Sequence, residues 1–282
     1  MSSTNRHEET DLGGQVAIVT GGGRGIGRAM ALALARAGAA VAAVARSTDQ
    51  LLQTVSLIEG LGGRAIAITA DVTDQQATEE MARDVEQQLG PVDLLVNNAG
   101  APTPVGPMWE TDPDAWWRCV AVNLQGPFLC SRAVLPGMVA RRRGRIITTA
   151  SGAGLGPGPY TSAYAIGKCA VIRFGENLAA ETKEHGISVF SINPSFVRTT
   201  MTEGLAKLPG DEKWLEGWAR KSLAAGEDVP PERAANLVVL LASGKADALS
   251  GCYISVHDDV AEMLRRAEEI QQNALHTLGL RT

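Results

Sequence analysis

The sequence predicts an α/β protein with a three-layer, doubly wound Rossmann fold around a seven-stranded parallel sheet. Short runs of β-type residues alternate along the chain with longer segments of helical composition, and parallel strands need long crossover connections of this kind. A glycine-rich turn, residues 20–27, comes directly after the first run. That is where a doubly wound sheet carries its dinucleotide-binding turn.

The seven predicted strands are short apolar runs bounded by turn residues. They cover residues 15–20, 40–45, 65–69, 93–96, 144–150, 187–192 and 252–256. The segments between them are predicted to be helices that cover both faces of the sheet, because right-handed crossovers place them there. The polar residues that follow six of these strands should therefore meet in one crevice at the carboxyl edge.

We expect one catalytic domain, because 282 residues with 45% hydrophobic content suit a single α/β core. Residues 1–13 are predicted to be a flexible N-terminus and 14–259 a Rossmann-type NADP-binding domain. Residues 198–230 break the alternation and should form a substrate lid; Trp214 and Trp218, one helical turn apart, either belong to it or pack ordinarily.

The segment 260–282 is predicted to be a helical tail. Apolar residues from Val260 to Leu278 recur at steps of one, three or four and form an amphipathic stripe. Such a stripe should pack on its own domain or on a neighbouring subunit, and we favour the neighbour.

Composition and charge narrow the classes of partner. A formal net charge of −5 argues against nucleic acid. The chain has no apolar run of about 20 residues, and residues 1–11 lack the apolar centre of a signal peptide, so we expect a cytoplasmic protein with no membrane partner. Cysteines 119, 130, 169 and 252 are too far apart for a C-x-x-C pair and are expected to be reduced core residues. No metal is expected, since the consecutive residues His257–Asp259 rarely converge on one ion.

The glycine turn has the spacing G-x-x-x-G-x-G at Gly21, Gly25 and Gly27. Glycines let a pyrophosphate approach the backbone, and the N-terminus of the following helix attracts the anion. On spacing alone a structural turn fits as well. The position after the first strand favours the cofactor.

Tyr164 and Lys168 stand four residues apart, so a helix would place both side chains on one face. A neighbouring cation lowers the pKa of a phenol, which suits a general acid or base at neutral pH. Tyr160 has no cation in the same relation and is expected to be a pocket wall.

Ser151 ends the fifth strand and can donate to a substrate carbonyl. Asn123 is a poor helix former in a helical stretch and predicts a local kink.

In this order and spacing the motifs resemble the short-chain dehydrogenases/reductases of the compact, single-domain kind, with similarity to the 3-oxoacyl-carrier-protein reductases. The resemblance covers about residues 14 to 257. The matching segments are 20–27, Asp71–Val72, Asn97–Gly100, Asn123, Ser151, Tyr164–Lys168 and Asn193–Pro194. Two positions depart from the pattern: Ser195 replaces a frequent glycine, and His257–Asp259 replaces a frequent Asp-Gly-Gly.

The resemblance implies hydride transfer at a nicotinamide, with the difficult chemistry supplied by the cofactor. It implies Tyr164 as the acid/base, Lys168 as its electrostatic partner and ribose ligand, and Ser151 as the carbonyl donor. It implies that Asn123 holds a water in a proton relay to Lys168. It also implies a homodimer or homotetramer.

Charge near the second strand favours NADP(H) over NAD(H). An acid about 20 residues beyond the glycines suits the NAD ribose, whereas arginine suits a 2′-phosphate. Ala45 stands in place of the acid, and Arg46 and Arg24 can reach the phosphate, although both could be ordinary surface arginines. The predicted cofactor residues are Gly21, Gly23, Arg24, Gly25, Ile26, Gly27, Arg46, Ser47, Asp71, Val72, Asn98, Ala99, Gly100, Tyr164, Lys168, Pro194, Val197 and Thr199.

The sequence thus predicts an NADP(H)-dependent oxidoreductase that interconverts a carbonyl and an alcohol group on a moderately apolar small molecule. Apolar residues of the lid, such as Met201 and Leu205, support the apolar character of the substrate. The alternatives are an NAD-dependent alcohol dehydrogenase of the same family and a non-catalytic module that senses NADP.

Overall fold

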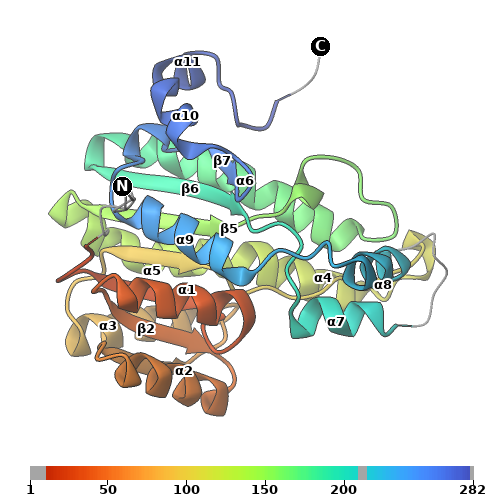
Figure 1. Ribbon diagram of the computed structural model, residues 1–282, viewed down its shortest axis with the longest axis horizontal. Coiled ribbons are helices and arrows are strands. Elements are labelled where there is room, and N and C mark those ends of the chain that lie inside the picture. The colour runs from red at the N-terminus through yellow and green to blue at the C-terminus, as the bar shows by residue number, and fades with distance from the viewer. Residues whose placement is uncertain (1–10, 209–214, 280–282) are drawn as a thin grey trace, which may run out of the picture.

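The computed structural model describes residues 11–208 and 215–279. Its centre is one parallel sheet in the order β3-β2-β1-β4-β5-β6-β7 (Figure 1). The strands are β1 Val16–Thr20, β2 Ala40–Ala45, β3 Ala65–Thr69, β4 Leu94–Asn97, β5 Gly144–Thr149, β6 Ile187–Asn193 and β7 Tyr253–Ser255. Each end lies within one residue of its prediction, so the predicted fold class is confirmed. The strand order reverses between β1 and β4, which is where such sheets bind ligands.

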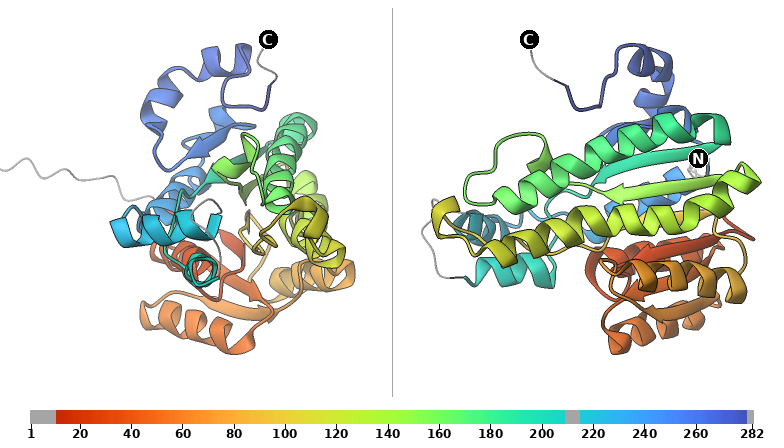
Figure 2. Two further views of the ribbon diagram at one scale, coloured as in Figure 1. Left: turned by 90° about the vertical axis from the view of Figure 1, so that its right-hand side faces the viewer. Right: turned by 180° about the vertical axis from the view of Figure 1, so that it is seen from behind.

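Helices cover both faces of the sheet, because successive strand residues point to opposite sides. In β1, Ala17 and Val19 belong to one core cluster, and Val16 and Ile18 belong to the other. The first face is covered by α1 Gly25–Arg36, α2 Thr48–Gly60 and α9 Pro231–Ala242; the second by α3 Gln75–Gln88, α5 Gly126–Arg141 and α6 Ser162–Thr182. Figure 2 shows the second set from behind, in orange, yellow-green and green.

Shorter elements surround the carboxyl edge of the sheet. These are η1 Met108–Glu110, α4 Pro113–Val120, η2 Ala121–Gln125, η3 Gly152–Gly154, α7 Thr200–Ala206 and α8 Leu215–Ala225. On the opposite edge, η4 Lys183–His185 precedes β6 and η5 Asp247–Leu249 precedes β7. None of the helices in the described ranges combines the length and the hydropathy that crossing a membrane requires.

The ordered domain begins before residue 14. Leu12 is 1% exposed within the core between the sheet and α1, and its N–H donates to the Ala37 carbonyl at 2.6 Å. The flexible segment predicted for residues 1–13 is therefore too long at its C-terminal end. Residues 1–10 lie outside the described residues.

The tail differs from the single helix that its stripe predicts. It forms two short helices, α10 Val260–Arg265 and α11 Ala267–Gln272, with a bend at Arg266 (Figure 1, blue). Val260, Met263 and Ile270 are all buried in the core of their own domain, so the preference for a neighbouring subunit was wrong for these side chains. The bend lets both short helices place apolar residues on that one core.

Beyond α11 the chain returns along the outer edge of β7. The Tyr253 N–H donates to the His276 carbonyl at 2.8 Å. The Leu278 N–H donates to Glu176 Oε1 at 2.6 Å, and Arg173 donates to the Leu278 carbonyl at 2.5 Å. We refer to residues 274–279 as the C-terminal strap, because they connect the end of the sheet to α6.

The cysteine prediction holds for three of four residues. Cys119, Cys130 and Cys252 are buried free thiols. Cys169 is a free thiol too, but it is exposed. It lies on α6 directly after the buried Lys168, and consecutive helical residues point about 100° apart, so burial of one leaves the other outside.

Candidate active site

The glycine turn folds as a phosphate-binding loop would. Gly21 and Gly25 have φ of 66° and 54°, in the left-handed region that favours glycine. A Cβ on Gly27 would overlap the Gly21 carbonyl oxygen. Arg24 occupies the N-cap of α1 and its side chain makes no capping bond to the described residues. The first N–H groups of α1 therefore remain available to an anion.

Two side chains that the sequence analysis missed hold this turn from α1 and α2. The Arg28 guanidinium donates to the Gly23 carbonyl and, at 3.3 Å, to the Gln50 carbonyl. Thr54 Oγ1 donates to the Gly22 carbonyl at 3.0 Å. The carbonyls of Gly22 and Gly23 are thus held by the protein, and the Gly22 N–H donates to the Val44 carbonyl at 3.2 Å.

The turn after β4 is attached to the glycine turn through Thr20. Thr20 Oγ1 accepts from the N–H groups of Asn98 and Ala99, both at 3.0 Å, and Asn98 Nδ2 donates to the Thr20 carbonyl at 3.1 Å. A Cβ on Gly100 would lie 3.2 Å from Asn123 Oδ1. The predicted residues Asn98, Ala99 and Gly100 therefore connect the glycine turn to the neighbourhood of Asn123.

The predicted cofactor residues 46, 47, 71 and 72 lie at the carboxyl ends of β2 and β3. Arg46 Nη1 is 3.9 Å from Asp71 Oδ2; the Arg46 side chain is largely exposed and that of Asp71 is about half-buried. Hydrogen bonds from the backbone and side chain of Thr73 lower the pKa of Asp71. Ser47 is the N-cap of α2. Val72 is buried against the start of α5, where a Cβ on Gly126 would lie 2.7 Å from it.

The helix is irregular where the sequence predicts a kink at Asn123. Asn123 lies within η2, a π-helical turn between α4 and α5, where one extra residue widens the helix. The side chain is 1% exposed, and its Nδ2 donates to the carbonyls of Cys119 and Ala101 at 2.9 and 3.0 Å. Its Oδ1 has no hydrogen-bond partner among residues 11–208 and 215–279. A buried acceptor of this kind calls for a bound polar group.

Tyr164 and Lys168 do share one face of α6. Lys168 is 4% exposed, its Nζ donates to the Thr149 carbonyl at 2.7 Å, and it lies 5.5 Å from the centre of the Tyr164 ring. Burial lowers the pKa of Lys168 to about 8. Burial also raises the pKa of Tyr164, which a hydrogen bond with Ser151 partly opposes. The pKa of Tyr164 is therefore raised by burial, whereas the neighbouring Lys168 alone predicts a lowered pKa.

The segment after Ser151 approaches α6 closely because Gly154, which the sequence analysis missed, has no side chain. The serine lies two residues after β5, at the N-cap of η3, and its Oγ accepts from the Ala153 N–H at 3.2 Å. A Cβ on Gly154 would lie 2.6 to 2.8 Å from backbone atoms of Lys168 and Cys169. This close approach of η3 to α6 brings the hydroxyl to the phenol.

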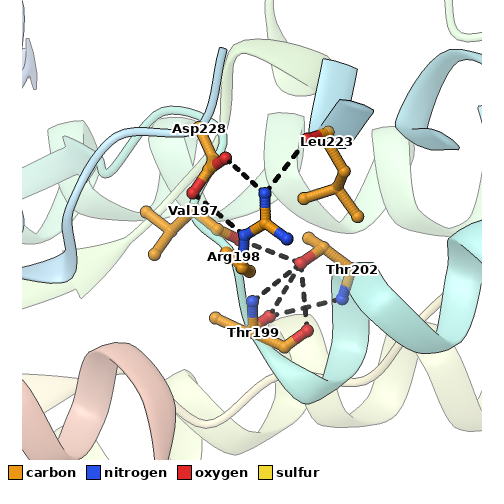
Figure 3. A network of polar contacts seen from close by, with 6 residues as sticks. All are labelled: Val197, Arg198, Thr199, Thr202, Leu223 and Asp228. Carbon is orange, nitrogen blue, oxygen red and sulfur yellow. Dashed lines mark hydrogen bonds and ion pairs between the residues drawn. The ribbon is translucent and has the colours of Figure 1, made fainter. Parts of the chain in front are cut away.

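The segment after β6 borders the glycine turn. A Cβ on Gly25 would lie 3.4 Å from the Thr199 methyl group. Val197 pairs with Val229 in a parallel bridge, while Pro194 is buried at the end of β6. Arg198 donates to Asp228 and to the Leu223 carbonyl, both at 3.0 Å (Figure 3). The two ends of the predicted lid are therefore joined at its base.

Aromatic residues near the lid have separate positions. Trp218 is exposed and packs edge-on against Phe196, with ring centres 4.8 Å apart. Trp214 lies outside the described residues. Tyr160 is exposed, has φ of 65°, and accepts from the Gly106 N–H at 3.0 Å, so its backbone holds two loops together. Its role as a pocket wall remains a prediction.

Comparison with known proteins agrees with this arrangement. A family model described as short chain dehydrogenase matches residues 15–208. A short chain dehydrogenase of Pseudocercospora fijiensis is 35% identical over 92% of this chain and 85% of its own length. The 3-oxoacyl-[acyl-carrier-protein] reductase of Thermotoga maritima is 34% identical over 87% and 97%.

A solved structure from Beutenbergia cavernae gives the same result. It is described as a candidate NAD(P) dependent gluconate 5-dehydrogenase with NADP bound at low occupancy. It superimposes with a TM-score of 0.78 at 34% identity, over 88% of this chain and 97% of its own. The protein therefore belongs to the short-chain dehydrogenase/reductase family, nicotinamide-dependent oxidoreductases that act on CH–OH and C=O groups.

Proposed function

We propose that the protein is an NADP(H)-dependent oxidoreductase that transfers a hydride between the nicotinamide and a carbonyl or alcohol carbon of a moderately apolar small molecule. The observation that carries the proposal is the meeting of Ser151, Tyr164 and Lys168: the Ser151 hydroxyl lies near enough to the Tyr164 phenol to lower its pKa, and a buried amine lies 5.5 Å from the ring. A decisive test is an absorbance assay of NADPH consumption against a panel of ketones and aldehydes.

In the reductive direction, Tyr164 donates its proton to the carbonyl oxygen while Ser151 donates a hydrogen bond to the same atom. The Lys168 ammonium stabilises the phenolate that remains. Lys168 keeps its charge below about pH 8 and loses it above, since burial lowers its pKa to about 8. The nicotinamide, when bound, supplies or accepts the hydride.

The buried Oδ1 of Asn123 supports a proton relay. An acceptor that lacks a partner among the described residues is satisfied by a water, and this water would extend from Asn123 toward the Lys168 amine. Such a water would pass protons from Asn123 toward Lys168 and Tyr164.

The chain also fits a dinucleotide. A Cβ on Gly21 would lie 2.9 Å from Asn98 Nδ2, so the glycine leaves the backbone accessible where two turns meet. Gly23, Gly25 and Ile26 belong to the same turn and would hold the pyrophosphate with the N-terminus of α1. Arg24 and Arg46 supply the positive charge that a 2′-phosphate needs. The alternative is NAD(H), for which Arg46 would be an ordinary surface residue.

Replacing Arg46 by aspartate should raise the KM for NADPH at least about tenfold and relatively favour NADH, because a charge-assisted hydrogen bond to phosphate is lost. Arg24→Ala should act in the same direction but less strongly, since Arg46 remains. Arg36→Asp, at the far end of α1, is the matched control. Steady-state kinetics with both nucleotides measure the effect. An unchanged KM for NADPH in Arg46→Asp would refute the 2′-phosphate contact.

A non-catalytic NADP-sensing module is the second candidate. It would use the same glycine turn but would not need a serine, a tyrosine and a lysine in contact. If the protein binds NADPH but consumes none with any carbonyl compound, this candidate replaces the first.

We propose a homodimer or homotetramer whose contact includes an apolar groove on α4, η2, α5 and α6. The groove has a volume of about 520 Å³ and is lined by Trp117, Val120, Ala121, Leu124, Gln125, Phe128 and Phe174. Trp117 is 64% exposed and Phe128 46%. Large apolar side chains gathered in this way are typical of protein interfaces.

Phe128→Glu should lower the molecular mass in light scattering to that of a smaller assembly, because a charge in an apolar contact is costly to bury. Leu52→Glu on α2, which is exposed to a similar extent, is the control and should keep the wild-type mass. A mass unchanged by Phe128→Glu would exclude the groove as a contact between subunits.

A further inference from the structure

The two departures from the family pattern contact each other. Ser195 Oγ and His257 Nε2 are 2.9 Å apart, although the residues are 62 positions apart in the sequence. Ser195 directly follows β6 and Pro194, and His257 lies two residues after β7. The pair therefore joins the carboxyl ends of two neighbouring strands.

Ser195 has the backbone of a glycine. Its φ is 62°, in the left-handed region that side chains other than Gly, Asn and Asp rarely enter. Its N–H donates to Asn193 Oδ1 at 3.0 Å, which steadies this turn. A glycine would adopt the same turn without strain, so what serine adds is the hydroxyl. Strained residues of this kind cluster at functional sites.

The pair lies next to the catalytic edge. β5, β6 and β7 are neighbours in the sheet, and neighbouring strands are about 4.8 Å apart. Ser151, Ser195 and His257 thus follow three consecutive strands. Asn193, which holds Ser195, has its Nδ2 3.7 Å from the point where a Cβ on Gly152 would lie, directly beside Ser151.

The backbone holds His257 in place. Its N–H donates to Ser255 Oγ at 3.3 Å, and the Ser255 N–H donates to Asp258 Oδ2 at 2.7 Å. The Val256 N–H donates to the Asn193 carbonyl at 3.0 Å, which continues the β6–β7 pairing. A site built on such a fixed turn positions its polar groups in advance.

The chemistry of the pair suits a neutral oxygen atom. A neutral imidazole has one donor and one acceptor nitrogen, and a hydroxyl can act as either. Whichever role Nε2 takes toward Ser195, Nδ1 has the other, and it has no partner in the part of the chain that the structure describes. Asp258 and Asp259 carry carboxylates directly after His257, and Arg233 Nη2 donates to the carbonyl of Val256 directly before it. This balance disfavours an anionic group.

We propose that Ser195 and His257 form a second polar contact for the substrate, which selects carbonyl compounds carrying a further neutral oxygen, a hydroxyl or a second carbonyl, beyond the reacting carbon. This inference rests on the proposed function, since it concerns the substrate of the Ser151–Tyr164 site.

The test compares ketones that differ by one hydroxyl. The pairs are hydroxyacetone with acetone, 4-hydroxy-2-butanone with 2-butanone, and 2-hydroxyacetophenone with acetophenone, each reduced with NADPH and with NADH. In the wild type, kcat/KM should favour the hydroxyketone in at least one pair. Ser195→Ala and His257→Phe should lower that ratio about tenfold, the effect of one hydrogen bond, while the plain ketone keeps its kcat/KM.

Two further variants separate specificity from folding. Ser195→Gly removes the hydroxyl and relieves the backbone, so it should unfold at no lower temperature than the wild type and still lose the ratio. His185→Phe, in η4 at the opposite edge of the sheet, should leave the ratio unchanged. A wild type that favours the plain ketone in every pair overturns the proposal, and so does an equal loss on both members of a pair. If no ketone is reduced with either nucleotide, the proposed function itself fails.

Discussion

Tyr164→Phe should lower kcat at least about 100-fold, the usual scale for the loss of a general acid. The variant keeps the ring that packs beside Lys168 but removes the proton that the carbonyl oxygen receives. Cofactor binding should persist, because the glycine turn is untouched. Steady-state kinetics together with NADPH fluorescence titration measure both effects.

Tyr160→Phe is the matched control, since it removes the same hydroxyl four residues earlier, on an exposed loop. Its kcat should stay within a few-fold of wild type. If Tyr160→Phe abolished turnover and Tyr164→Phe did not, the two roles assigned to these residues would have to be exchanged.

Gly154→Ala should reduce both stability and turnover. The new Cβ would meet backbone atoms of Lys168 and Cys169 at 2.6 to 2.8 Å, and backbone moves less readily than a side chain. Relief requires η3 to move away from α6, which takes Ser151 away from Tyr164. Overpacking of this kind costs about 1–3 kcal/mol, and the displaced hydroxyl should lower kcat at least about tenfold.

Gly156→Ala provides the comparison, because a Cβ on Gly156 would have no described atom within 4 Å. Thermal unfolding and kcat of this variant should match the wild type. Equal melting temperatures and turnover for Gly154→Ala and Gly156→Ala would show that the contact between η3 and α6 does not position Ser151.

The sheet was predictable because burial on both faces leaves short, continuous apolar runs that turn residues interrupt. Tyr164, Lys168 and Asn123 were recognisable from local spacing and composition. Arg28, Thr54 and Gly154 were not, because each acts on backbone groups that only the folded chain brings near. The prediction of a single tail helix was wrong, because the stripe with helical spacing continues through Arg266 while the chain bends there and places both halves on one core.

Ser195 and His257 illustrate the same limit. Each departure was visible in the sequence, but nothing local indicated that the two residues are partners. Their hydrogen bond depends on β6 and β7 being neighbours, which is a property of the sheet order.

The C-terminal strap should limit aggregation of the protein at high concentration. The last strand of an open sheet presents unpaired N–H and C=O groups that can template another chain. β7 is three residues long, and its Tyr253 N–H is already bonded to His276. The C-terminal strap thus covers the edge strand of the sheet. A tag or truncation that displaced the strap would expose this edge, on which copies of the protein can aggregate.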